Sequence, residues 1–199
     1  MDKFLKSALL FLLLGYWPGA SSCRTDPPPP RHIAEQPRPT NTKPASEIPE
    51  SVPEPIFVQE GLLEFRGADG AKTLLRLEIE IAHDGAERAK GLMWRKKMDD
   101  KQAMLFIFDY SEPQSFWMRN IYIPFDMIFV NEKFEVVTVL KNVPVLNDAP
   151  RPSGKPAQYV IEVNAGLADR YGITPGSKVA WSDFVTGRPG GDFPVDAFQ

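Results

Sequence analysis

Cysteine and histidine are nearly absent from this sequence, and their scarcity narrows the chemistry that it can carry. The 199 residues include one cysteine, Cys23, and two histidines, His32 and His83. A single cysteine cannot form a disulfide within the chain. Structural zinc sites are usually built from four cysteine or histidine side chains. We therefore expect no internal disulfide, no metal site and no bound cofactor.

The sequence also lacks an excess of positive charge. Its formal net charge is −3 and its isoelectric point is about 5.5. Proteins that bind nucleic acid usually present a broad cationic face to the phosphates. We therefore expect no nucleic-acid partner. With 43% hydrophobic and 25% charged residues, the composition is that of a globular protein, and the length suits one domain with extensions.

The longest apolar run lies at the N-terminus and has the order of an export signal. Lys3 and Lys6 precede the apolar residues 8–14, and small residues follow at 19–22. The run is shorter than the roughly 20 apolar residues that span a membrane. We therefore predict that residues 1–22 are a signal peptide and that the protein is exported.

Cys23 directly follows the small residues, an arrangement that resembles a bacterial lipoprotein signal. In such a signal the cysteine is lipidated and becomes the mature N-terminus. The alternative is ordinary cleavage near Ser21 or Ser22, which would leave a free thiol. An exposed free thiol is reactive outside the cytoplasm, so we favour a lipid anchor at Cys23. The expected location is the periplasm or the outer cell envelope.

Residues 23–56 read as a proline-rich linker. Ten of the twenty prolines in the chain lie between Arg24 and Pro55. Such a segment has few apolar residues to bury and is expected to be extended and semi-rigid. We interpret it as a spacer that holds the folded domain away from a membrane surface.

Residues 57–182 carry alternating apolar and polar residues and are predicted to form one β-rich domain. Asp84 and Glu87 have the spacing of a capping box, which predicts a short helix ending at Gly91. The alternation of residues 74–82 places Glu78 and Glu80 on a solvated face. The expected strands are 62–66, 74–82, 103–108, 125–130, 134–140, 159–163 and 178–182. Residues 109–113 and 142–157 are expected to be loops, residues 165–171 one or two helical turns, and residues 183–199 a loosely ordered tail.

The stretch 116–130 is the most aromatic run outside the N-terminus, yet it contains several polar side chains. Burying a polar group without a partner costs roughly 2–7 kcal/mol, so the fold must pair these groups. Beyond Pro124 the alternation places Phe125, Met127 and Phe129 on one face. Asp126 then falls on the opposite face, which is otherwise apolar.

Several motifs in order resemble an uncharacterised bacterial and archaeal family, the domain-of-unknown-function family 192. The match covers about residues 74–181. It departs at Arg119, where lysine is usual, and at Ile121, Phe125 and Ser177, which replace threonine, leucine and aspartate. The resemblance implies a compact, mainly β fold, often exported, with no established activity. The motifs are residues 86–95 (AERAKGLMWR), 104–106 (MLF), 116–120 (FWMRN), 123–126 (IPFD) and 159–163 (YVIEV), followed by Ala165, Gly166, Gly172, Ile173 and Gly176.

Taken together, these patterns predict a mainly β (β-rich α+β) sandwich or barrel-like domain with one or two short helices. The leading functional hypothesis is a non-catalytic module that binds a small polar or anionic ligand or a partner protein. Trp117 would form an aromatic wall beside the polar groups. Trp94 could form a second wall, but a place in the core is the favoured interpretation. The candidate ligand-binding residues are Trp117, Arg119, Asn120, Asp126, Arg95 and Glu162.

Three alternatives compete with ligand binding. Asp126 and Glu162 could act as the carboxylate pair of a hydrolase, but no Gly-x-Ser-x-Gly motif is present, and we rank an enzyme below a binding module. The polar residues could form a purely structural cluster in which an arginine–carboxylate pair fixes strand register. The methionines could bind a soft metal, but their neighbours are Leu, Phe and Trp, which favours core packing.

Overall fold

A computed structural model describes residues 52–188 and 190–191. The predictions of a signal peptide, of lipidation at Cys23 and of most of the proline-rich linker lie outside these residues, as does most of the C-terminal tail. Within the described residues, no helix has the length and the apolar character that a membrane span requires.

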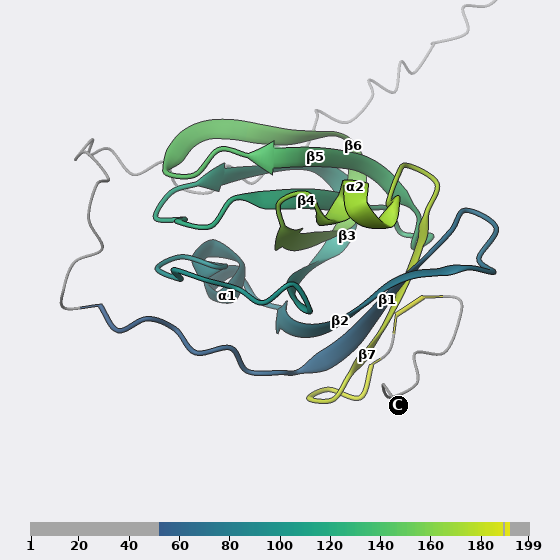
Figure 1. The fold of residues 1–199 in the computed structure, drawn as a ribbon, viewed down its shortest axis with the longest axis horizontal. Coiled ribbons are helices and arrows are strands. Elements are labelled where there is room, and N and C mark those ends of the chain that lie inside the picture. The colour runs from purple at the N-terminus through teal and green to yellow at the C-terminus, as the bar shows by residue number, and fades with distance from the viewer. Residues whose placement is uncertain (1–51, 189, 192–199) are drawn as a thin grey trace, which may run out of the picture. The chain divides into compact units, whose positions relative to one another are not determined.

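Seven strands form one sheet in the order β5-β4-β6-β3-β2-β1-β7. Two short helices accompany the sheet (Figure 1). The strands are β1 (Gly61–Arg66), β2 (Thr73–Ala82), β3 (Gln102–Met118), β4 (Phe125–Val130), β5 (Val136–Val143), β6 (Asn147–Asn164) and β7 (Lys178–Asp183), and the helices are α1 (Gly85–Lys90) and α2 (Leu167–Tyr171).

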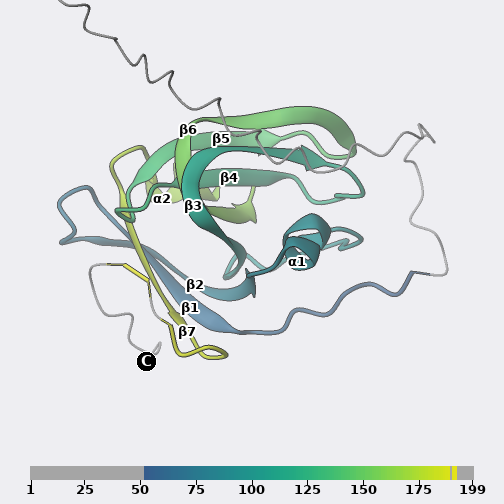
Figure 2. The same ribbon diagram turned by 180° about the vertical axis from the view of Figure 1, so that it is seen from behind.

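The two ends of the sheet meet, so the domain is barrel-like. A bridge joins Glu135 to Lys178, and the Val136 N–H donates to the Ser177 carbonyl over 2.9 Å. Figures 1 and 2 show β3 and β6 bending as they cross the domain. The predicted β-rich, barrel-like fold with two short helices is confirmed.

The alternation of β4 separates two hydrophobic clusters. Ile128 and Val130 belong to a core cluster that also contains the apolar faces of β1 and β2. Met127 and Phe129 belong to a second cluster on the opposite face of the sheet. The segment after α1 covers this second face, because it contributes Leu92 and Met98 to the cluster. The central strands are therefore buried on both faces.

The local predictions for turns and caps are confirmed. β1 and β2 form an antiparallel hairpin. Asp84 accepts the N–H groups of Ala86 and Glu87, and the Glu87 side chain accepts the Asp84 N–H, which completes the capping box. α2 ends at Gly172 in the left-handed conformation (φ 70°), which favours glycine.

The predictions of loops at residues 109–113 and 142–157 are wrong, because β3 and β6 extend through most of both segments. Proline lacks an N–H and usually interrupts a sheet. Here Pro113 lies opposite Pro156, so the two residues that lack an N–H share one position of the ladder. Register shifts on both sides of Pro113 absorb the remaining mismatch.

Candidate functional site

Asp126 is fully enclosed, and its carboxylate accepts three backbone N–H groups. The donors are Asn142 at 2.8 Å, Gly166 at 2.9 Å and Ala168 at 3.0 Å. Asn142 lies at a register shift between β4 and β5, and the other two donors belong to the first turn of α2. Asp126 therefore ties three elements together, and backbone donors replace the arginine partner that one interpretation required.

The two carboxyl groups of the proposed hydrolase lie on opposite faces of the sheet. Asp126 pairs in register with Val163, and Met127 pairs with Glu162. Neighbouring residues of a strand point to opposite faces, so Asp126 shares the face of the core cluster and Glu162 shares the face of the second cluster. A catalytic pair must reach one bond from both sides of a single site. The hydrolase interpretation of Asp126 and Glu162 is therefore wrong.

Glu162 is a buried carboxyl group without a partner. It lies between Met104 of β3 and Met127 of β4 in the register of the sheet. It is 4% exposed, and it makes no hydrogen bond or ion pair with any residue that the structure describes. Burial penalises its charged form and raises the pKa of Glu162 to about 8. The group is therefore mostly protonated at neutral pH and can donate a hydrogen bond.

Arg95 is buried beside Glu80, in a pair that the sequence interpretation missed. The Arg95 Nη2 donates to Glu80 Oε1 over 2.7 Å and lies 2.6 Å from Oε2. The Val58 N–H also donates to Oε1 over 3.0 Å. The prediction of a solvated Glu80 is wrong, because the segment after α1 covers this face of β2 and turns an outward position into a buried one.

Three loops meet at one end of the sheet, and each holds a non-glycine residue in the left-handed backbone region. These residues are Trp94 (φ 69°), Asn120 (φ 56°) and Leu146 (φ 51°). The Trp94 N–H donates to the Asn120 carbonyl over 2.9 Å, and the Leu146 N–H donates to the Ile121 carbonyl over 3.1 Å. Such conformations cost of order 1–3 kcal/mol each and cluster at binding sites. We refer to these segments, residues 91–98, 117–124 and 144–148, as the loop cluster.

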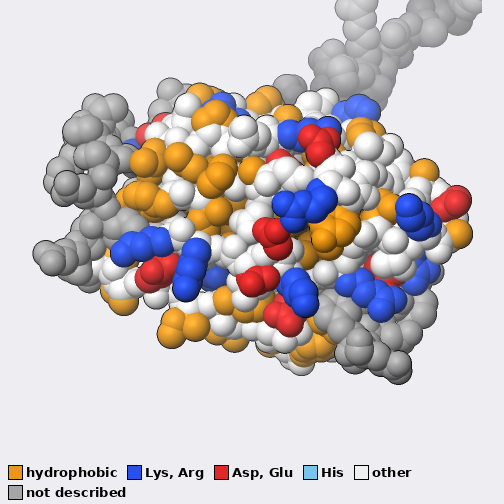
Figure 3. Space-filling model, viewed as in Figure 1, with side chains coloured by type: hydrophobic (Ala, Val, Ile, Leu, Met, Phe, Trp, Pro, Cys, Tyr) orange, Lys and Arg blue, Asp and Glu red, His pale blue; other side chains and the backbone are white. Residues whose placement is uncertain are grey.

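The loop cluster presents half-buried aromatic rings and polar groups. Trp94 lies against Tyr122 with ring centroids 6.4 Å apart, so Trp94 is not the core residue that the sequence predicted. Trp117 is also half-buried. Arg119 makes a long ion pair with Asp148, in which Nη2 lies 3.4 Å from Oδ2. Hydrophobic side chains are exposed over the region above α1 in the space-filling view (Figure 3).

The structure thus divides the predicted site. Trp117, Arg119 and Asn120 lie together in the loop cluster, with Arg95 next to Trp94 in the same segment. Asp126 is buried on the other face of the sheet, toward the first core cluster, whereas Glu162 is buried on the second face, which the segment after α1 covers. No sequence signal identifies Trp94 as left-handed, because the conformation is set by the hydrogen bond to a loop 26 residues away. Among the described residues, no group of three or more His, Cys, Asp or Glu side chains could hold a metal ion.

Two crystal structures resemble the chain. A protein of unknown function from Novosphingobium aromaticivorans DSM 12444 is 36% identical, with 59% of this chain and 82% of that chain covered and a TM-score of 0.56. A proposed transcription regulator from Sinorhizobium meliloti 1021 is 34% identical, with 62% of this chain and 95% of that chain covered and a TM-score of 0.58. A comparison with curated proteins finds no match.

A family model matches residues 67–181, which include the loop cluster, the Glu80–Arg95 pair and Glu162. The family is DUF192, described as Uncharacterized ACR. The match spans more than half of the chain and agrees with the resemblance carried by the sequence motifs. The chain therefore belongs to the DUF192 family.

Proposed function

We propose that this domain is a non-catalytic binding module of the cell envelope that takes a small polar or anionic ligand at the loop cluster. The observation that carries the proposal is the hydrogen-bonded pair of left-handed residues, Trp94 and Asn120. A bulky side chain at φ 69° costs free energy that packing alone rarely requires. We interpret this strain as a consequence of holding the Trp94 ring and the Asn120 amide in the positions that bind a ligand.

The chemistry of the loop cluster fits a ligand that has both a flat apolar face and hydrogen-bonding groups, such as a sugar or a small carboxylate. Trp94 and Tyr122 offer aromatic surfaces, and Asn120 carries an amide that can both donate and accept. The Arg119–Asp148 pair is long and its Asp148 side chain is 59% exposed, so it holds the guanidinium only weakly. The guanidinium can therefore turn to the carboxylate of a ligand.

The proposed location follows from the N-terminal residues. An export signal at residues 1–22, a lipid on Cys23 and a proline-rich spacer up to residue 56 would display the domain at the periplasmic or outer membrane surface. The acidic net charge supports a small ligand rather than nucleic acid as the partner.

Thermal denaturation of the full-length chain in detergent tests the proposal, with N-acetylglucosamine, glucose, acetate and succinate as probes. At least one probe should raise the melting temperature of the wild type. The Asn120→Gly variant should melt at the wild-type temperature or above, because glycine adopts φ 56° without strain, yet it should lose the ligand-induced increase.

Asn142→Gly is the matched control, because Asn142 is also left-handed (φ 48°) but lies outside the loop cluster. It should keep the full response to the ligand, and glycine retains the N–H that Asp126 accepts. Equal responses of the two variants would show that Asn120 has no part in binding. If no probe stabilises the wild type, the polar residues are better explained as a structural cluster.

A further inference from the structure

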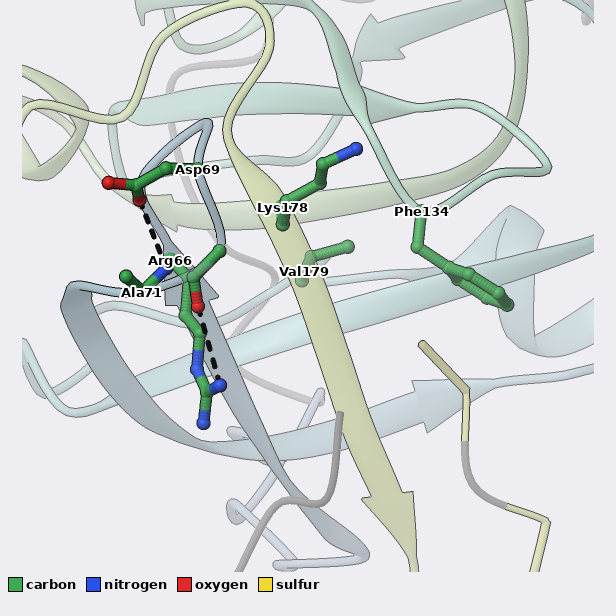
Figure 4. Close-up of a pocket in the computed structure, with 7 residues that line it drawn as sticks. Arg66, Asp69, Ala71, Phe134, Lys178 and Val179 are labelled. Atoms are coloured by element: carbon green, nitrogen blue, oxygen red, sulfur yellow. Dashed lines mark hydrogen bonds between the residues drawn. The ribbon is translucent and has the colours of Figure 1, made fainter. Parts of the chain in front are cut away.

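A hollow of about 310 Å³ lies where the two ends of the sheet meet, between the β1–β2 turn and the start of β7 (Figure 4). Figure 4 shows the side chains of Arg66 and Lys178, two of its lining residues, directed away from each other. The hollow therefore does not gather charged groups around one point. A buried carboxyl group that has no partner among the described residues, that of Glu162, lies elsewhere in the sheet.

Glu162 has a methionine directly opposite it on each neighbouring strand. Met104 of β3 and Met127 of β4 are its partners in the two antiparallel registers. Directly opposite residues share one face of a sheet, and their Cβ atoms lie about 5 Å apart. A methionine side chain is unbranched and has three rotatable bonds, so it adapts to its surroundings. Both thioether sulfur atoms can therefore reach the carboxyl group, one from each side.

A third methionine lies on the segment that covers this face. The Asn164 Nδ2 donates to the Met98 carbonyl over 2.8 Å. Asn164 is two positions beyond Glu162 on β6, so the two side chains share a face of the sheet. Met98 also belongs to the same hydrophobic cluster as Met104 and Met127. The hydrogen bond therefore holds Met98 over β6 beside Glu162.

A second buried acid in line with Glu162 shows what the fold does for a structural carboxylate. Glu80 of β2 is the partner of Met104 on the other side of β3. It accepts Arg95 Nη2 over 2.7 Å and the Val58 N–H over 3.0 Å. Within the described residues, the fold thus supplies a cation to Glu80 and none to Glu162. An unpaired polar group in a native interior calls for an explanation, such as an ion that binds there.

The donors around Glu162 fit a soft monovalent cation. Thioether sulfur selects Cu(I), whereas harder divalent ions prefer oxygen ligands. One carboxylate supplies the single negative charge that a monovalent cation needs in an apolar interior, where an unpaired charge is costly. The apolar neighbours of the methionines along the chain favour core packing, but the register places an unpaired acid between two of them. Core packing alone does not account for that acid.

We propose that this carboxylate and three thioether groups bind one Cu(I) ion; the ligands are Glu162, Met98, Met104 and Met127. Burial raises the pKa of Glu162 to about 8, so the cation takes the place of the Glu162 proton, which is released to solvent. Met98 and Met104 are 9% and 7% exposed, which leaves the ion a narrow route from solvent at the covering segment. The site uses neither Trp94 nor Asn120 and does not depend on a ligand at the loop cluster.

Anaerobic competition for Cu(I) with the chelator bicinchoninate tests this assignment. The parent protein is the full-length Cys23→Ser chain in detergent, because a free thiolate would compete for the metal. It should take up one Cu(I) per chain. Glu162→Gln and Met127→Leu should each weaken binding by at least about tenfold, since the loss of a group that only orients a ligand already lowers metal affinity by about 10- to 100-fold. A parent protein that leaves all of the Cu(I) with the chelator would overturn the assignment.

Two matched controls remove the same kinds of group outside the site. Met93→Leu removes a sulfur atom that lies 3.8 Å from the Asn120 amide nitrogen, and Glu78→Gln removes a carboxyl group of β2. Both should keep the Cu(I) affinity of the parent. Exchange of methionine for leucine conserves volume, so all variants should fold, as judged by their melting temperatures. Parent affinity in folded Glu162→Gln or Met127→Leu would overturn the assignment, as would equal weakening by Met93→Leu and Met127→Leu.

Discussion

Replacing Glu162 by glutamine should change the stability of the domain in a way that depends on pH. The pKa of Glu162 is raised from 4.5 to about 8 by burial. The folded state therefore keeps its proton up to about pH 8, whereas the unfolded chain releases it near pH 4.5. Between these values the unfolded state binds fewer protons than the folded state, so the free energy of unfolding falls as the pH rises.

The size of the effect follows from the interval between the two pKa values. Each pH unit is worth about 1.4 kcal/mol, so the full interval amounts to about 5 kcal/mol. This figure is an upper bound, because water can enter around an ionised group. Glutamine has nearly the same shape as the protonated glutamic acid and cannot ionise. The Glu162→Gln variant should therefore match the wild type within about 1 kcal/mol at pH 5, since a conservative change of this kind has a small cost.

Urea denaturation at pH 5, 7 and 9 measures this difference. The variant should become progressively more stable than the wild type as the pH rises, by up to several kcal/mol at pH 9, because the wild type must then hold a buried charge. Taking the difference between the two proteins at each pH cancels the titration of all other groups. A difference that stays constant from pH 5 to pH 9 would refute the raised pKa and the reasoning from burial.

Three further changes test other parts of the structure. Asp126→Asn should lower the free energy of unfolding in urea by about 3 kcal/mol or more, because an amide cannot accept three N–H groups as a carboxylate does; wild-type stability would contradict the structural role. Glu80→Gln should cost about 3–5 kcal/mol, because it leaves the buried Arg95 charge without its partner, whereas Glu78→Gln on the same strand should change stability by less than about 0.5 kcal/mol. Labelled palmitate should mark the wild-type protein in cells but not Cys23→Ser, and equal labelling would disprove the lipid anchor.

The sequence predicts the capping box, the two faces of β4 and the positions of the strands, because these depend on local spacing. It does not predict the full lengths of β3 and β6. Asp126 was also identifiable as a polar residue on an apolar face. The environment of Glu80 was not predictable, since its burial depends on the segment around Arg95 folding back over β2. Alternation within a strand reports which residues share a face, but it does not reveal whether a distant segment covers that face.

Coverage by distant segments also explains why the polar residues that stand out in the sequence differ from the residues of the candidate binding site. Asp126 and the Glu80–Arg95 pair lie in the sheet or beneath a covering segment, and their polar atoms are used to join elements of the domain. Ligands need accessible groups on loops that a rigid scaffold positions. The left-handed residue Trp94 fits this requirement, because its half-buried ring lies where the segments of the loop cluster meet. Binding of a small polar ligand is therefore to be sought at the loop cluster rather than along the strand whose polar residues stand out in the sequence.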